Sequence, residues 1–105
     1  MDGPHELSFP ADHPAFAGHF PGEPILPGAV LLDAVLQRIA ADLGWDLGCC
    51  EVASAKFLSI VRPGAQLQLR YQPGPRGAVG FEVHAAGRSI ASGTLLTHGR
   101  PGGGR

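Results

Sequence analysis

Two residues, His19 and Asp33, are set apart by their neighbours. His19 lies in HPAFAGHFPGEPILPG, and five of the ten prolines fall between Pro10 and Pro27. Proline fixes φ and disfavours helix before it, so this segment is expected to be a stiff, irregular loop. Asp33 lies in the apolar run AVLLDAVLQRIAADL. A carboxyl group there is costly unless it is paired, hydrogen-bonded or functional, and burial would favour its protonated form, as a general acid requires. We predict that His19 and Asp33 are catalytic.

Two further residues, Gly28 and Gln37, are expected to support this pair. Gly28 lies at the predicted helix N-terminus, where free backbone N–H groups and the helix dipole favour an oxygen that gains negative charge. Gln37 follows Asp33 by one turn and would orient it. From the dipeptide alone, Pro27-Gly28 would be an ordinary turn. The remaining acids and histidines that we considered are interpreted as surface or packing residues: His5, His13, His84, His98, Asp42 and Asp46.

The element pattern predicts an α+β fold. A helix from Gly28 to about Leu43 carries apolar residues all round, which is typical of a helix buried on every side. A short strand is expected near His5–Phe9. Turn signals separate four further candidate strands, which would form an antiparallel meander around the helix: Val52–Val61, Gln66–Gln72, Val79–Ala85 and Ser89–Thr97. This is the hotdog arrangement, an antiparallel sheet wrapped around one long central helix.

The composition narrows the possible partners. The 105 residues fit one domain, which we assign to residues 1–97 with a disordered Gly-rich tail at 98–105. A net charge of −1 indicates no nucleic-acid or membrane partner. Residues 38–105 hold eight basic and four acidic residues, a balance of +4, so this half could face an acidic partner or simply be solvated.

The cysteines and the N-terminal residues indicate the compartment. Cys49 and Cys50 are adjacent, which rarely allows a disulfide between them, and no Cys/His metal spacing is present. No secretory leader opens the sequence and no long apolar run is present. We expect a cytoplasmic protein without a bound metal.

The run GHFPGEPILPGAVLLDAVLQ, residues 18–37, resembles the active-site segment of the hotdog-fold β-hydroxyacyl-acyl-carrier-protein dehydratases. That pattern is His-Phe-Pro-Gly, then Pro, Pro-Gly and an acidic residue in the central helix, and the spacing from His19 to Asp33 is 33 − 19 = 14, as in the family. Asp33, where another large branch has Glu, is similar to the dehydratase–isomerase branch. The segments Lys56-Phe57 and Arg62-Pro63-Gly64 also resemble the family. The chain is shorter than typical stand-alone members, and short members resemble accessory dehydratases of polyene or polyketide-like pathways.

The resemblance implies a homodimer, or a higher oligomer, with sheets joined edge to edge. His19 of one chain would face Asp33 of the other, and an acyl chain carried on the phosphopantetheine of acyl carrier protein would enter between them. His19 would remove the α proton, the Gly28 N–H would hold the enolate oxygen, and Asp33 would protonate the departing hydroxyl. No cofactor is implied.

Two other functions remain open. The first is an acyl-thioester hydrolase on the same fold, although such enzymes usually lack the HFPG…PG run. The second is a non-catalytic subunit that binds acyl carrier protein. Fold analogy does not choose among the three functions, whereas the presence of both His19 and Asp33 favours the dehydratase.

Overall fold

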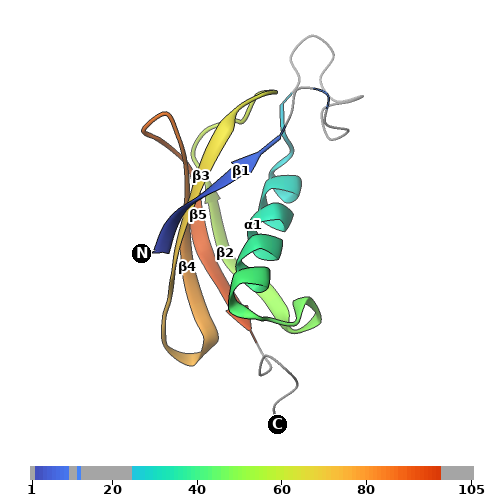
Figure 1. The fold of residues 1–105 in the computed structure, drawn as a ribbon, viewed down its shortest axis with the longest axis vertical. Helices are drawn as coiled ribbons and strands as arrows, with labels where there is room; N and C mark the ends of the chain where they lie inside the picture. Colours follow the sequence, from blue (N-terminus) through green and yellow to red (C-terminus); the bar gives the residue numbers. More distant parts are fainter. Residues whose placement is uncertain (1, 10–11, 13–24, 98–105) are drawn as a thin grey trace.

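The computed structural model describes residues 2–9, 12 and 25–97, and in this part of the chain one α-helix packs against a five-stranded antiparallel sheet (Figure 1). The predicted α+β class and the hotdog arrangement are confirmed. His19 and the predicted tail, residues 98–105, lie outside the described residues. The elements run in the order β1 (Asp2–Ser8), α1 (Gly28–Leu43), β2 (Cys50–Phe57), β3 (Gln66–Pro73), β4 (Ala78–Ala85) and β5 (Arg88–Thr97), with short 3₁₀ turns η2 (Leu47–Cys49) and η3 (Pro75–Gly77).

The helix α1 has the predicted bounds. It begins at Gly28, directly after an extended Pro27, and ends at Leu43 before Gly44. Its buried residues face the sheet: Leu31, Val35, Ile39 and Ala40. The opposite face is exposed along residues spaced four apart: Ala29, Asp33, Gln37 and Ala41. The prediction that this helix is buried on all sides is therefore wrong for the single chain, because the sheet covers one side of it only. In the described residues no helix is long and apolar enough to cross a bilayer.

The strand order is β1-β3-β4-β5-β2, with every neighbouring pair antiparallel. Strands β3, β4 and β5 form the predicted meander. The prediction is wrong for β2, which does not pair with β3, the next strand along the chain. Instead β2 pairs with β5 at one edge of the sheet, and β1 pairs with β3 at the other. The helix thus connects strands at opposite edges of the sheet.

The alternating patterns in β3 and β4 identify the core face of the sheet. Leu67, Leu69 and Tyr71 are buried on β3 while their neighbours are exposed. On β4 the buried positions are Val79, Phe81 and Val83. These side chains join the buried helix residues in one hydrophobic cluster, as the period-two pattern predicts.

The strand β2 ends earlier than predicted. The apolar pattern predicts a strand as far as Val61, but the strand stops at Phe57. The N–H groups of Leu58 and Ser59 both donate to the Ile90 carbonyl, at 2.8 and 3.3 Å, which interrupts the regular ladder with β5. Leu58 and Ile60 are about half exposed, at 53% and 48%, so their apolar character does not reflect burial in this chain.

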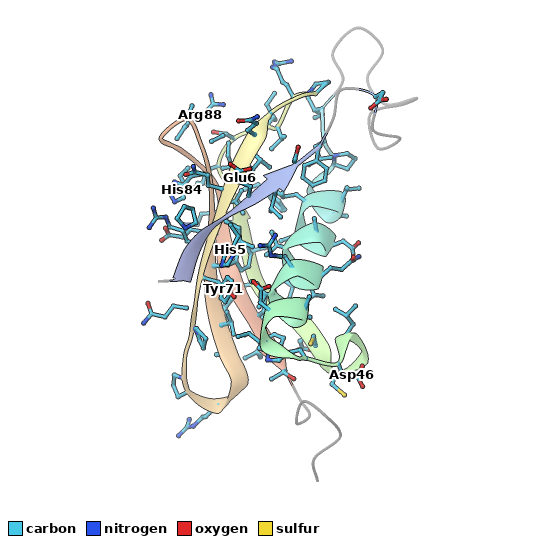
Figure 2. All side chains as sticks on the ribbon, in the orientation of Figure 1. His5, Glu6, Asp46, Tyr71, His84 and Arg88 are labelled. Carbon is cyan, nitrogen blue, oxygen red and sulfur yellow. The ribbon has the colours of Figure 1, made fainter. Side chains whose placement is uncertain are left out.

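A polar cluster ties the C-terminal half of α1 to β1 and β3, between the sheet and the helix (Figure 2). The Tyr71 hydroxyl donates to Asp42 Oδ2 at 2.9 Å, and Arg38 Nη2 donates to His5 Nδ1 at 3.2 Å. The His5 ring stacks on Tyr71, with 5.1 Å between ring centroids. Asp42 is exposed as a residue, as the sequence predicts, but its side chain is 28% exposed and also contacts Arg38 at 3.4 Å, so it has a structural role that the sequence did not indicate.

The cluster predicts a measurable contribution to stability. We expect Tyr71→Phe to lower the free energy of unfolding by about 1 kcal/mol, because Asp42 loses a hydrogen bond in a half-buried setting. Asp33→Asn is the matched control, since this acid is exposed and its hydrogen-bond partner Gln37 lies on the same helix. Urea unfolding of the two variants should separate them, and equal losses would show that the Tyr71–Asp42 bond does not secure the helix.

Candidate active site

The N-terminus of α1 carries the first part of the candidate site. Within the described residues the Gly28 N–H has no hydrogen-bond partner, while the N–H groups of Val30 and Leu31 bond to the Pro27 carbonyl at 3.0 and 3.2 Å. A backbone N–H at the positive end of a 16-residue helix suits an oxygen that gains negative charge.

Gly28 is packed against an aromatic ring. A Cβ atom built on Gly28 would lie 2.8 Å from Cζ of Phe57, closer than real Cβ contacts allow. Glycine therefore lets the ring and the helix approach each other without displacement of the ring. Phe57 is itself 47% exposed, so the ring covers the glycine on one side and remains accessible on the other.

An apolar pocket of about 520 Å³ opens beside Gly28. Ser59 is the one residue with a polar side chain among those that line it: Ile25, Leu26, Pro27, Gly28, Leu31, Phe57, Ser59, Ile60 and Val61. A pocket of this size and character suits an aliphatic chain. Sequence pattern alone assigns neither Phe57 nor the segment 59–61 to the site, because they follow the helix in sequence and reach its N-terminus only through the fold.

Asp33 and Gln37 form the second part of the candidate site. Gln37 Nε2 donates to Asp33 Oδ2 at 2.7 Å, the contact that the helical spacing predicts, while the role of Gln37 in the site stays a prediction. The expectation that Asp33 is buried is wrong for the single chain, because it lies on the exposed face of α1.

The structure does not bring Gly28 and Asp33 together within one chain. Asp33 does not line the pocket beside Gly28. The two residues are five positions apart on an α-helix, which places them about 140° apart around its axis. His19 lies outside the described residues, so its distance from either part stays untested.

The described residues contain no other strong candidate for catalysis. No group of three or more His, Cys, Asp or Glu side chains in this part of the chain could hold a metal ion. Burial raises the pKa of the Cys50 thiol, and the side-chain hydrogen bond with Thr97 only partly offsets this effect. A thiol with a raised pKa holds less of the nucleophilic thiolate at neutral pH.

The sheet, the single helix and the pocket at the helix N-terminus define a hotdog-fold protein. Residues 4–94 match the ApeI-like family, described as ApeI dehydratase. The chain belongs to the ApeI-like dehydratase family.

Two bacterial 3-hydroxyacyl-acyl-carrier-protein dehydratases named FabZ are similar in sequence. The protein from Chloroflexus aggregans is 39% identical over 69 residues, covering 59% of this chain and 48% of the relative. The protein from Dinoroseobacter shibae is 37% identical over 81 residues, covering 69% and 49%. The chain spans about half the length of the curated relatives that it matches.

Two solved structures support the fold. The dehydratase heterocomplex ApeI:P from Xenorhabdus doucetiae has a TM-score of 0.72 at 21% identity, covering 87% of this chain and 81% of that one. A thioesterase from Thermus thermophilus, complexed with coenzyme A and Zn, has a TM-score of 0.59 at 20% identity, covering 99% and 85%. At these identities the likeness shows the fold alone.

The contact between Gly28 and Phe57 can be tested directly. We expect Gly28→Ala to displace the Phe57 ring while changing the free energy of unfolding by less than about 1 kcal/mol, because the ring is half exposed and free to move. Aromatic proton NMR would report the displacement, with Phe57→Leu used to assign the ring. Unshifted Phe57 resonances in Gly28→Ala would contradict this contact.

Proposed function

We propose that this protein is a dehydratase that converts β-hydroxyacyl thioesters, carried on acyl carrier protein, to trans-2-enoyl thioesters in fatty-acid or polyene-type biosynthesis. The observation that carries the proposal is the apolar pocket that opens beside Gly28, the first residue of α1. The match to the ApeI-like dehydratase family supports this assignment, as does the similarity to the FabZ dehydratases.

In the proposed reaction the acyl chain occupies the apolar pocket and the thioester carbonyl accepts a hydrogen bond from Gly28. His19 removes the proton from the α carbon, and the electron pair passes towards the carbonyl oxygen, where the helix N-terminus stabilises it. The bond from the β carbon to the hydroxyl then breaks. Asp33, oriented by Gln37, gives that hydroxyl a proton, so one water leaves. The proton on His19 returns to Asp33 through solvent. This scheme requires no cofactor.

The proposed active site is shared between two copies of the chain. Gly28 and its pocket face a different direction from Asp33, so one chain does not place both beside one substrate. A second copy, packed against the exposed face of α1 and the edge strand β2, would bring its own Asp33 to the pocket. The exposed apolar side chains on and near β2 support such an interface: Val52, Phe57, Leu58 and Ile60.

A second pocket, of about 410 Å³, offers a surface for an acidic carrier. It contains Arg62 and Arg88, lacks any acidic lining residue, and shares the segment 59–61 with the apolar pocket. Figure 2 shows Arg88 towards the end of the sheet where α1 begins. We propose that this basic pocket receives acidic groups of the carrier while the acyl chain enters beside Gly28. We place the reaction in the cytoplasm, to which the unpaired Cys49 and Cys50 are suited.

The catalytic assignment predicts the behaviour of two variants. We expect His19→Ala and Asp33→Asn each to lower kcat for dehydration at least about a hundredfold, because each removes a proton-transfer group. Ultraviolet absorbance of the conjugated enoyl thioester measures the reaction, and hydration of the enoyl substrate should be followed too. Asp46→Asn, at the far end of α1, is the control and should keep full activity. Release of free thiol without loss of water would instead indicate a thioesterase, and binding without turnover a non-catalytic subunit.

If Arg62 and Arg88 bind the carrier, their substitution should affect a carrier-bound substrate more than a short synthetic thioester. We expect Arg62→Glu and Arg88→Glu to raise KM for a carrier-bound substrate about tenfold at low salt, and to change kcat/KM for a short synthetic thioester much less. Arg76→Glu, which makes the same charge change in the β3–β4 turn at the opposite end of the sheet, should leave both values near wild type. Equal losses on both substrates would exclude a role confined to the carrier.

A further inference from the structure

One short segment, residues 59–61, belongs to both the basic pocket and the apolar pocket. Ser59, Ile60 and Val61 line each of them. The other lining residues differ, since Gly28 borders only the apolar pocket and Arg88 borders only the basic one. A ligand that occupies both pockets therefore contacts this segment.

The backbone of the segment is held by hydrogen bonds on two sides. The Ser59 N–H donates to the Ile90 carbonyl on β5 at 3.3 Å. The Val61 carbonyl accepts a hydrogen bond from the Leu26 N–H, just before α1, at 2.8 Å. The Val61 side chain is buried in the core. The fold thus fixes the segment between β5 and the residues that precede the helix, so its side chains have defined places beside the two pockets.

Ser59 differs in polarity from the rest of the apolar pocket. It is the one residue with a polar side chain among those that line this pocket. It is partly buried, whereas Leu58 and Ile60 on either side of it are about half exposed. An apolar side chain of similar size would fill the same space, so packing gives no reason for a hydroxyl here. A hydroxyl can both donate and accept a hydrogen bond, which suits a polar group of a ligand.

The ligand proposed for the two pockets carries such groups. In the proposed function the carrier lies at the basic pocket and the acyl chain lies beside Gly28, so the pantetheine arm extends from one pocket to the other. This arm contains two amides between its phosphate and its sulfur. An amide that leaves water for an apolar surface costs free energy unless it gains a hydrogen bond. Among the side chains of the shared segment, only that of Ser59 can form one.

We infer that the Ser59 hydroxyl forms a hydrogen bond with an amide of the pantetheine arm and thereby selects thioesters that carry this arm. The inference rests on the proposed function, because that function places the carrier and the acyl chain at the two pockets. Ser59 is then a specificity-determining residue, since it contacts a part of the substrate that the reaction leaves unchanged. The reacting carbons lie beside Gly28, which does not border the basic pocket.

Thioesters with and without amides test this inference. The same β-hydroxyacyl group is attached to pantetheine, which has two amides, to N-acetylcysteamine, which has one, and to propanethiol, which has none. Ser59→Ala should raise KM for the pantetheine thioester about fivefold and keep kcat within about twofold, because a neutral hydrogen bond is lost on binding. KM for the propanethiol thioester should not change. A raised KM for the N-acetylcysteamine thioester would assign the amide nearer the sulfur, and an unchanged one would assign the other amide.

Two isosteric substitutions separate the hydroxyl from the volume of the side chain. Thr and Val have nearly the same shape, and only Thr carries a hydroxyl. We expect Ser59→Val to keep the raised KM for the pantetheine thioester and Ser59→Thr to lower it again. Ser92→Ala is the control for a serine outside both pockets, because Ser92 lies opposite Glu82 in the sheet, and it should leave KM unchanged. Circular dichroism should show native secondary structure in every variant.

Binding of unreactive ligands separates this inference from the proposed function. Saturated acyl thioesters of pantetheine and of propanethiol have no β-hydroxyl to lose, so NMR titration measures their Kd without dehydration. Ser59→Ala should raise Kd about fivefold for the pantetheine ligand only. A wild-type protein that binds neither ligand, or a Ser59→Ala variant that affects both equally or neither, would overturn the inference. A protein that shows the expected difference in Kd but dehydrates no thioester would contradict the proposed function alone.

Discussion

A single helix covers a sheet that is wider than the helix. This difference in width determines which face of the helix and which edge of the sheet stay exposed. An α-helix with its side chains is about 10 Å across, whereas five strands span roughly 20 Å. The buried residues of α1 reach the core positions of β3 and β4 but leave the side chains of β2 exposed. One face of the helix and one edge of the sheet therefore remain uncovered, and they carry Asp33 and the apolar residues of the proposed interface.

The polar cluster at the other side of the helix explains why the uncovered region lies at β2. Tyr71 on β3 and His5 on β1 hold Asp42 and Arg38, so the C-terminal half of α1 is secured towards that half of the sheet. At its N-terminus the helix instead contacts Phe57 at the end of β2, through Gly28, where a Cβ atom would press against the ring. The helix thus lies between the two edges, with its first residue at the pocket.

The sequence predicted the features that depend on local chemistry. Proline before Gly28 and glycine after Leu43 defined the helix, and alternation defined the core positions of β3 and β4. The hydrogen bond from Gln37 to Asp33 followed from helical spacing. The position of β2 beside β5 was not predictable in this way, because alternation indicates a strand and its faces but not its distant neighbour.

The sequence predicted which residues belong to the candidate site but not how they are arranged in space. The identities of Gly28, Asp33 and Gln37 could be inferred from their sequence context, but burial of Asp33 was inferred from apolar neighbours on the assumption that one chain covers the whole helix. Many of those neighbours are small alanines or lie on the sheet side, so they do not surround the carboxylate. Phe57 and the segment 59–61 were missed because folding alone brings them to the N-terminus of α1.

The outer strand β1 limits how far such molecules can assemble. Its pairing with β3 shifts register between Asp2 and His5, and it contains Pro4, which has no N–H to offer a further strand. When two chains meet at β2, the strands at the two ends of the joined sheet are both β1. An irregular, proline-bearing margin at each end is poorly suited to continued addition, so growth of the sheet would stop at two subunits. In this fold the edge at β2 can pair with another strand, whereas the edge at β1 is poorly suited to pairing. This difference would protect a small, weakly charged protein from forming fibres.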